Sequence, residues 1–332
     1  MQHIDCACSE RSALSQPISS PIIDWVSFSL CKSVISCNYV TNSHRNHRVR
    51  DHMSKATEPD EEKEIATVTS ADGTEIVYER SGSGPPSVFV HGSTVDRVVW
   101  ELGDVRSRFA EHTTVHAMDR RYHGDSGSPD EYSGKPDPQF DDVVAVVESI
   151  DDPVTLIGHS YGALVALGAA PRIDNLRSLI LYEPPIVSKE GFARLEGTVE
   201  EMITLIEAGE NEQAYTLFLG DIAKFAPDEL DAIRSAPVWD RYTDRFPQTL
   251  LPELEAGAES GGRDLTPFEN LTTPTLLPVG TESGWLKESA EKVHDTLPNS
   301  RLVTFDGHGH ALYFVAPERF TDEVLSFISD VD

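Results

Sequence analysis

Residues Pro153–Ala170 read PVTLIGHSYGALVALGAA, and this stretch decides the predicted fold. The opening PVTLI is typical of a short buried strand, and the small and apolar residues after Gly162 are typical of a buried helix. Between them, Ser160 stands at the centre of the sequence Gly-His-Ser-Tyr-Gly. A serine at such a tight strand-to-helix turn projects its hydroxyl over the sheet edge, beside free backbone N–H groups of the helix. We therefore interpret Ser160 as a nucleophile rather than as an ordinary helix cap.

Strand patterns of the same kind recur on both sides of this stretch. A hairpin at 65–80 is followed by six short apolar runs bounded by turn formers, at 86–90, 113–118, 153–157, 179–182, 275–279 and 301–305. Helical patterns separate these runs, as at 141–150 and 317–328. The alternation predicts an α/β fold with a largely parallel sheet and helices on both of its faces.

One interval, from 186 to 273, has no convincing strand. Its apolar residues follow helical spacing, as at Val199 and Met202. We expect a helical cap inserted after the sixth strand, over the sheet edge where folds of this kind bind ligands. An additional helical layer without that function is the alternative. The core would then comprise residues 65–185 and 274–332.

The base expected beside Ser160 is His310. It follows the last predicted strand in the glycine-rich loop Asp-Gly-His-Gly-His at 306–310. From such a loop an imidazole can accept the proton of a serine hydroxyl and later return it. His308 in the same loop is the rival, and support of the loop is the simpler interpretation of that residue.

Together these segments resemble the α/β-hydrolase fold family. The strand that ends in HGS at 91–93, the segment DRRYHGDS at 119–126, GHSYG around Ser160 and GHGHA around His310 follow the family's order. The similarity covers about residues 65–330. It implies a mostly parallel eight-stranded sheet, a serine nucleophile and acyl-transfer chemistry without a cofactor. Relatives with dehalogenase or epoxide hydrolase activity use an aspartate nucleophile instead, so the resemblance excludes them.

The resemblance also implies an oxyanion hole. It would consist of the backbone N–H of Tyr161, directly after the nucleophile, and that of Ser93, after His91-Gly92. These two groups would stabilise the negative charge that develops on the substrate oxygen.

The acid of the catalytic triad stays open between two glutamates. Many relatives place an aspartate where this chain has Ser283, which cannot serve. Glu183 ends the sixth strand, where some subfamilies carry their acid, and Glu282 lies one residue before the usual position. Either could orient His310 and stabilise its cationic form. We favour Glu183, because its tyrosine and proline neighbours would hold it rigidly.

The composition restricts the partners of the chain. Its 332 residues include 27 Lys or Arg and 56 Asp or Glu, a formal net charge of −29 at pH 7. Nucleic acids and anionic membrane surfaces would be repelled, and no apolar stretch is long enough for a transmembrane helix. We expect a cytoplasmic protein that binds neither. The acidity indicates either an ordinary acidic protein or, as we favour, adaptation to molar salt, which predicts loss of structure at low salt.

Residues 1–52 differ from the rest of the chain. They hold all four cysteines and carry five bases against four acids. A small metal or disulfide module, a targeting segment and sequence upstream of a true start at Met53 are the three interpretations. We favour the last, with a disordered extension as its variant, because the cysteine spacing fits no usual zinc pattern and no basic region precedes the apolar run. An acidic tail at 53–64 would then precede the core.

Three functions are compatible with these residues. The leading one is a serine hydrolase that cleaves a small soluble carboxylic ester, lactone or thioester through an acyl-enzyme. A cofactor-free perhydrolase or haloperoxidase would share Ser160 and His310, and a catalytically silent ligand-binding protein would fit the departure at Ser283. The body shows no metal-ligand constellation and no glycine-rich nucleotide loop after a strand, so we expect no metal and no cofactor. The sequence predicts neither the particular substrate nor the oligomeric state.

Overall fold

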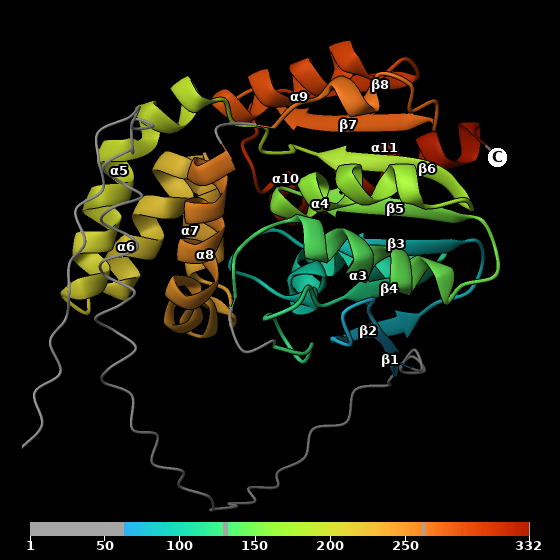
Figure 1. Ribbon diagram of the computed structural model, residues 1–332, viewed down its shortest axis with the longest axis horizontal. Coiled ribbons are helices and arrows are strands. Elements are labelled where there is room, and N and C mark those ends of the chain that lie inside the picture. The colour runs from blue at the N-terminus through green and yellow to red at the C-terminus, as the bar shows by residue number, and fades with distance from the viewer. Residues whose placement is uncertain (1–62, 129–131, 261–262, 332) are drawn as a thin grey trace, which may run out of the picture. The chain divides into compact units, whose positions relative to one another are not determined.

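The computed structural model describes residues 63–128, 132–260 and 263–331. The predicted extension at 1–52 and nearly all of the predicted acidic tail lie outside these residues, although Glu64 already belongs to the first strand. An eight-stranded sheet forms the centre of the fold (Figure 1). Its strands are β1 (Glu64–Thr69), β2 (Glu75–Ser81), β3 (Pro86–Val90), β4 (Thr114–Met118), β5 (Val154–His159), β6 (Leu176–Tyr182), β7 (Thr275–Gly280) and β8 (Ser300–Phe305).

The strands lie side by side in the order β1-β2-β4-β3-β5-β6-β7-β8. Strand β2 pairs antiparallel with β1 on one side and with β4 on the other, and every other neighbouring pair is parallel. All residues of β3, β4 and β5 are buried, which explains why these strands read as mostly apolar runs without a regular alternation of polar residues. The predicted mostly parallel eight-stranded sheet with an initial hairpin is confirmed.

Helices cover both faces of the sheet and create two hydrophobic cores. Along β3, Val88 and Val90 belong to one core and Phe89 to the other, because successive side chains point to opposite faces. The first core is completed by α3 (Asp137–Glu148), α4 (Tyr161–Ala169) with the 3-10 turn η2 (Ala170–Arg172), and α9 (Trp285–Thr296). The second is completed by η1 (Arg97–Asp104), α2 (Val105–Ala110), α10 (Leu312–Val315) and α11 (Pro317–Asp330).

A set of helices connects β6 to β7, within the interval where helices were expected. It consists of α5 (Lys189–Glu207), α6 (Asn211–Leu217), a π-helical turn η3 (Phe218–Ile222), α7 (Pro227–Arg234) and α8 (Trp239–Ser260), followed by the short η4 (Thr266–Phe268). We call α5 to α8 the inserted helices. In Figure 1 they stand at the left, beyond the arrowheads of β6 and β7. They therefore lie at the carboxyl ends of the strands, where side chains after each strand can meet them.

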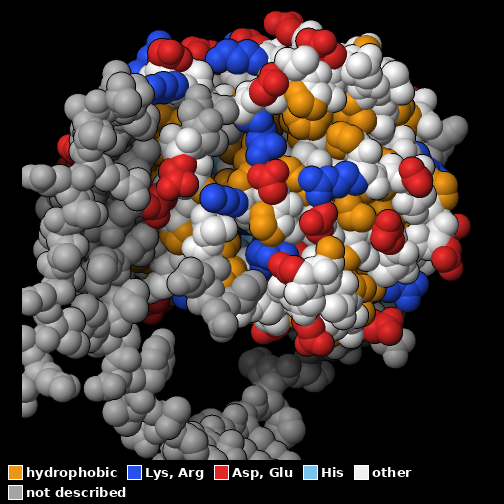
Figure 2. Space-filling view, viewed as in Figure 1, with side chains coloured by type: hydrophobic (Ala, Val, Ile, Leu, Met, Phe, Trp, Pro, Cys, Tyr) orange, Lys and Arg blue, Asp and Glu red, His pale blue; other side chains and the backbone are white. Residues whose placement is uncertain are grey.

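The surface reflects the acidic composition. Figure 2 shows Asp and Glu side chains spread over the whole coloured face, with fewer Lys and Arg side chains among them. None of the described helices combines the length and apolar character that crossing a membrane requires.

Candidate active site

Ser160 occupies the strained turn between β5 and α4. Its backbone has φ +54° and ψ −124°, in the region that L-residues rarely adopt. The turn depends on glycines, because a Cβ at Gly158 would collide with the carbonyl of Gly162, and one at Gly162 with the carbonyl of Val90. The Ser160 amide donates to the carbonyl of Tyr182 at 2.9 Å, which ties the turn to the neighbouring strand β6. The serine is thus held at the carboxyl edge of the sheet, half-buried.

His310 lies in the loop between β8 and α10 and is buried. Its Nδ1 atom is hydrogen-bonded to Oε2 of Glu183, which leaves Nε2 on the opposite side of the ring. Burial lowers the pKa of the His310 imidazole well below its ordinary value, because a cation without water around it is unfavourable. At neutral pH the ring is therefore neutral and able to accept a proton.

Glu183 follows β6 directly and is fully buried, with a left-handed backbone (φ +50°). Its Oε1 atom accepts hydrogen bonds from the Gly280 amide at 2.7 Å and from the Ser283 hydroxyl. Burial raises the pKa of the Glu183 carboxyl, and the hydrogen bonds from Ser283 and Gly280 oppose that rise. Ser283 thus donates a hydrogen bond to the same carboxylate that contacts His310.

The two rival residues lie elsewhere. The Glu282 side chain is exposed, and its Oε1 atom accepts from the Thr281 hydroxyl at 3.5 Å. The His308 carbonyl accepts from the Glu282 amide at 2.9 Å, a contact within the loop region. The structure therefore brings Glu183, and not Glu282, to His310.

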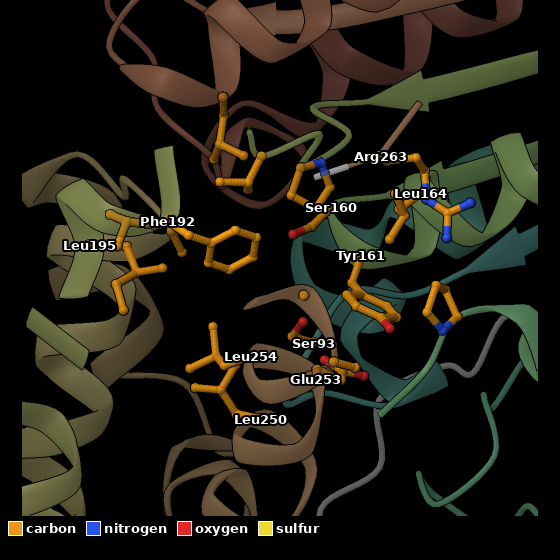
Figure 3. A pocket seen from close by; sticks show the side chains of 18 of the residues that line it. Ser93, Ser160, Tyr161, Leu164, Phe192, Leu195, Leu250, Glu253, Leu254 and Arg263 are labelled. Carbon is orange, nitrogen blue, oxygen red and sulfur yellow. The ribbon is translucent and has the colours of Figure 1, made fainter. Parts of the chain in front are cut away.

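A cavity of about 330 Å³ opens in front of Ser160. Its lining includes Ser93, Tyr161 and His310, so all the predicted site residues except the two glutamates reach it. Apolar side chains form most of the remaining wall, and many come from α5 and α8: Phe192, Leu195, Leu250 and Leu254. Figure 3 shows the Ser160 hydroxyl pointing into this space, with Phe192 on the facing wall. The site is thus a largely apolar chamber with Ser160 and His310 at the sheet edge and a few charged side chains, among them Glu253 and Arg263, elsewhere in its wall.

Ser93 and Tyr161 flank the serine from two different elements. Tyr161 is the first residue of α4, and amides in the first turn of a helix have no acceptor within that helix. Ser93 follows β3 and Gly92, where a Cβ would stand 3.1 Å from the Ser160 Cβ. The loop that carries Ser93 is fixed by Arg120, whose Nη2 donates to the Gly92 carbonyl at 2.9 Å. Ser93 and Tyr161 therefore line the same cavity as Ser160, one from the loop after β3 and the other from the start of α4.

A buried ion pair behind this loop was not predicted. The Arg120 guanidinium donates to Oε1 of Glu253, on α8, at 2.8 Å, and both side chains are buried. Tyr132 donates to the same oxygen at 2.7 Å. Burial alone would raise the pKa of Glu253, but the charge of Arg120 and the hydrogen bonds from His123 and Ser93 together outweigh it, and the pKa falls to about 2. Because Glu253 lines the cavity and Arg120 holds the Ser93 loop, the pair joins an inserted helix to the site.

The family model described as the alpha/beta hydrolase family matches residues 88–323. The chain belongs to this family. The match extends from β3 to α11 and so includes every residue of the candidate site. It confirms the resemblance, and with it the prediction of an enzyme of the hydrolase class.

Among proteins similar to this hydrolase are enzymes with different activities. The 2-(acetamidomethylene)succinate hydrolase of Mesorhizobium japonicum is 27% identical over 258 residues, 74% of this chain and 89% of the relative. The non-heme chloroperoxidase CPO-A1 of Kitasatospora aureofaciens is 26% identical over 282 residues, 79% of this chain and 98% of the relative. The crystal structure of the esterase RhEst1 from Rhodococcus sp. ECU1013 is 25% identical with a TM-score of 0.67, covering 81% of this chain and 99% of that chain.

Some signals for the missed residues do exist in the sequence of this hydrolase. Arg120 belongs to the quoted segment at 119–126, yet its partner Glu253 lies in an interval without a motif. His159 precedes the nucleophile, and its Nε2 atom meets the His310 carbonyl at 3.2 Å. Within the described residues, no group of three or more His, Cys, Asp or Glu side chains is arranged to hold a metal ion.

Proposed function

We propose that this hydrolase cleaves a small soluble carboxylic ester, lactone or thioester through an acyl-enzyme on Ser160. The observation that carries the proposal is the hydrogen bond between His310 and Glu183 at the wall of a cavity into which Ser160 projects. This arrangement combines a nucleophile, a neutral base and a carboxylate that orients the base, which is the logic of a serine-histidine-acid triad.

In the first half of the reaction, the Ser160 oxygen attacks the carbonyl carbon of the substrate. Nε2 of His310 takes the hydroxyl proton, because Nδ1 is already bound to Glu183. The negative charge moves to the carbonyl oxygen, where the amides of Ser93 and Tyr161 would donate to it. Collapse of this intermediate breaks the bond to the leaving alcohol or thiol, which receives the proton from His310.

The second half repeats these roles with water. His310 removes a proton from a water molecule, and the resulting hydroxide attacks the acyl carbon. Collapse releases the carboxylic acid, and the Ser160 oxygen recovers its proton from His310. Each proton that leaves an oxygen is thus returned to one, and no oxidant or reductant is needed.

The cavity supports a small, largely apolar acyl or alcohol group. A volume of about 330 Å³ lies at the small end of ligand cavities, which span about 300–1,000 Å³. Because α5 and α8 supply much of its apolar wall, we propose that the inserted helices are the cap of this enzyme and select its substrate.

The test is covalent labelling with a fluorophosphonate, which reacts with activated serines. The full-length protein in molar salt is compared with Ser160→Ala, His310→Ala and Glu183→Gln. Glu282→Gln is the matched control, since it removes the same charge from an exposed position. We expect no labelling of the Ser160 and His310 variants, slow labelling of Glu183→Gln and unchanged labelling of the control. A folded wild-type protein that does not react would overturn the proposal.

A second reaction is favoured by one observation, the similarity to a chloroperoxidase. Hydrogen peroxide in place of water would convert the acyl-enzyme to a peracid, which oxidises halide and returns the carboxylic acid. Assays with peroxide, bromide and a short carboxylic acid separate this reaction from hydrolysis. Halide oxidation that disappears in Ser160→Ala would support it, and its absence in an enzyme that hydrolyses esters would exclude it.

A further inference from the structure

The loop that carries His310 is bound at three successive residues to the segment that runs from the end of η3 into α7. The His310 amide donates to the carbonyl of Lys224 at 3.3 Å. The amides on either side of it, those of Gly309 and Ala311, donate to the side chain of Glu229 at 2.8 Å and 3.1 Å. No other described hydrogen-bond set connects one side chain to both neighbours of a site residue.

Glu229 lies in the first turn of α7 and is fully buried. It has no basic partner among the ion pairs of the described residues, so backbone amides are what compensate its carboxylate. Burial raises the pKa of Glu229, and hydrogen bonds from Ala226, Ala311 and Gly309 oppose that rise. A carboxyl group buried in this way is costly unless its hydrogen bonds are all made.

Helix capping accounts for only one of these bonds. Oε2 of Glu229 accepts from the Ala226 amide at 2.9 Å, the bond by which a glutamate at this position stabilises the start of a helix. An exposed glutamate would cap α7 equally well without the cost of burial. The bonds to Gly309 and Ala311 lie across the structure, 80 and 82 residues further along the chain, and serve no helix start.

The close contact also constrains the loop. A Cβ at residue 309 would stand 2.7 Å from Glu229 Oε2, 2.7 Å from the Ala226 amide and 2.7 Å from the Lys224 carbonyl. Only glycine therefore allows α7 to approach the loop this far. Lys224, which lies between η3 and α7, has φ +59°, a strained value for a residue with a side chain. The segment that contacts the His310 loop is therefore also held in an unfavourable backbone conformation.

We propose that Glu229 is a positioning residue for His310. By fixing the amides before and after the histidine, it holds the imidazole between Glu183 and Ser160 at the distance that proton transfer requires. The inference rests on the proposed function, in which His310 is the base. It makes α7 part of the catalytic support, although none of the described residues that line the cavity comes from α7.

The experiment compares Glu229→Gln and Glu229→Asp with wild type in the full-length protein. Asp228→Asn is the matched control, because Asp228 precedes Glu229 on α7, is exposed and loses the same charge. A glutamine presents an NH₂ group to backbone donors, so at least one bond is lost, while aspartate keeps the charge but is one methylene shorter. The fluorophosphonate labelling rate is measured per reactive site, with kcat and KM for a chromogenic acetate ester and the melting temperature.

We expect the labelling rate and kcat of Glu229→Gln to fall about 10- to 100-fold, as when the support of a catalytic group is lost or the group is displaced by about 1 Å. KM and the fraction of protein that finally reacts should stay unchanged, and Asp228→Asn should behave as wild type. A merely structural role would reduce the reactive fraction and the melting temperature instead. Wild-type rates in either folded Glu229 variant would overturn the inference.

Two further measurements distinguish a failure of the proposed function from a failure of the inference about Glu229. If His310→Ala labels as fast as wild type, the proposed function fails, whatever Glu229 does. Hydrogen exchange in the wild-type protein tests the contact without any variant, which covers the case in which Glu229 variants do not fold. The amides of Gly309 and Ala311 should exchange more slowly than that of Gly307, which bonds to the Thr281 hydroxyl near the surface. Equal exchange would contradict the proposed fixation.

Discussion

At the scale of single residues, the ends of β6 and β7 bring Glu183 and Ser283 together. Parallel strands end at one edge, so side chains that follow β6 and β7 reach the same point. Glu183 occupies that point, and Ser283 donates to its Oε1 atom. If Glu183 is the acid of the proposed triad, Ser283 is a hydrogen-bond donor to that acid.

The first prediction concerns this bond. Burial raises the pKa of Glu183 and the Ser283 bond lowers it, so Ser283→Ala should raise the pKa further. The proposed mechanism needs an ionised Glu183 and a neutral His310, and therefore the acidic limb of the pH profile should move to higher pH. A hydrogen bond to a charged group is worth about 1.5–3 kcal/mol, which corresponds to a shift of about 1 pH unit or more. Measurement of kcat/KM against pH checks this, and an unmoved limb would contradict it.

The sequence located Ser160 and His310 because each lies in a local motif whose residues also shape the backbone. It left Glu183 and Glu282 open, since only the packing of β6 against β7 decides which carboxylate is buried beside the histidine. Glu229 and Glu253 could not be recognised at all. They are two of 56 acidic residues, and no neighbouring residue distinguishes a buried carboxylate from an exposed one.

At the scale of elements, two helical glycines should respond differently to substitution by alanine, because only one of them, beside the turn between β5 and α4, is packed closely against another segment. Gly162, in α4, faces the backbone of Val90, whereas a Cβ on Gly197, in α5, would meet nothing within 4 Å. Gly162→Ala should therefore lower the free energy of unfolding by at least about 1–3 kcal/mol through overpacking. Gly197→Ala should raise it by about 0.4–1 kcal/mol. Urea unfolding of both variants measures the difference, and similar values would refute the assigned role of Gly162.

Strand positions were predictable for a related physical reason. Strands buried on both faces are mostly apolar, and Pro86–Val90 was predicted with the bounds that β3 has. The predicted ends of helices were less accurate. Helix α3 begins at Asp137, whereas the apolar spacing that predicted it begins only at residue 141. The first turn of α3 contains proline and polar residues that carry no periodic signal. The arrangement of the inserted helices could likewise not be predicted from the sequence, since it depends on long-range contacts.

At the scale of the whole molecule, the pair of Arg120 and Glu253 connects the core to an inserted helix through two buried charges. Glu253→Gln should lower the free energy of unfolding by about 3–5 kcal/mol at neutral pH, because the substitution leaves the Arg120 guanidinium buried without a counter-charge. The pKa of Glu253 is depressed to about 2, below its unfolded value. Its stabilising contribution is therefore complete above about pH 4.5 and is lost as the pH falls towards 2. The difference in unfolding free energy between wild type and variant should narrow over that range, and a constant difference would argue against the assignment.

The net charge of −29 leads to a prediction about salt. Carboxylates are scattered over the coloured part of the face in Figure 2. Their mutual repulsion acts over a Debye length of about 10 Å at about 0.1 M salt but only about 3 Å at about 1 M. We expect the melting temperature to be lower at the lower concentration by about 5–10 °C, equivalent to a few kcal/mol in a chain of this size. Calorimetry in KCl checks this, and a melting temperature independent of salt would contradict adaptation to molar salt.

The bonds from Glu229 to the histidine loop bear on how such an enzyme can be redesigned or diverge. If α7 supports His310, the segment between β6 and β7 cannot simply be exchanged between relatives. A chimera that receives this segment from a relative would gain a different cavity, but it would lose the hydrogen bonds by which Glu229 holds the His310 loop. Variation in substrate preference is free to accumulate in the chamber walls on α5 and α8. Residue 229 and the glycine at 309 would have to be inherited together.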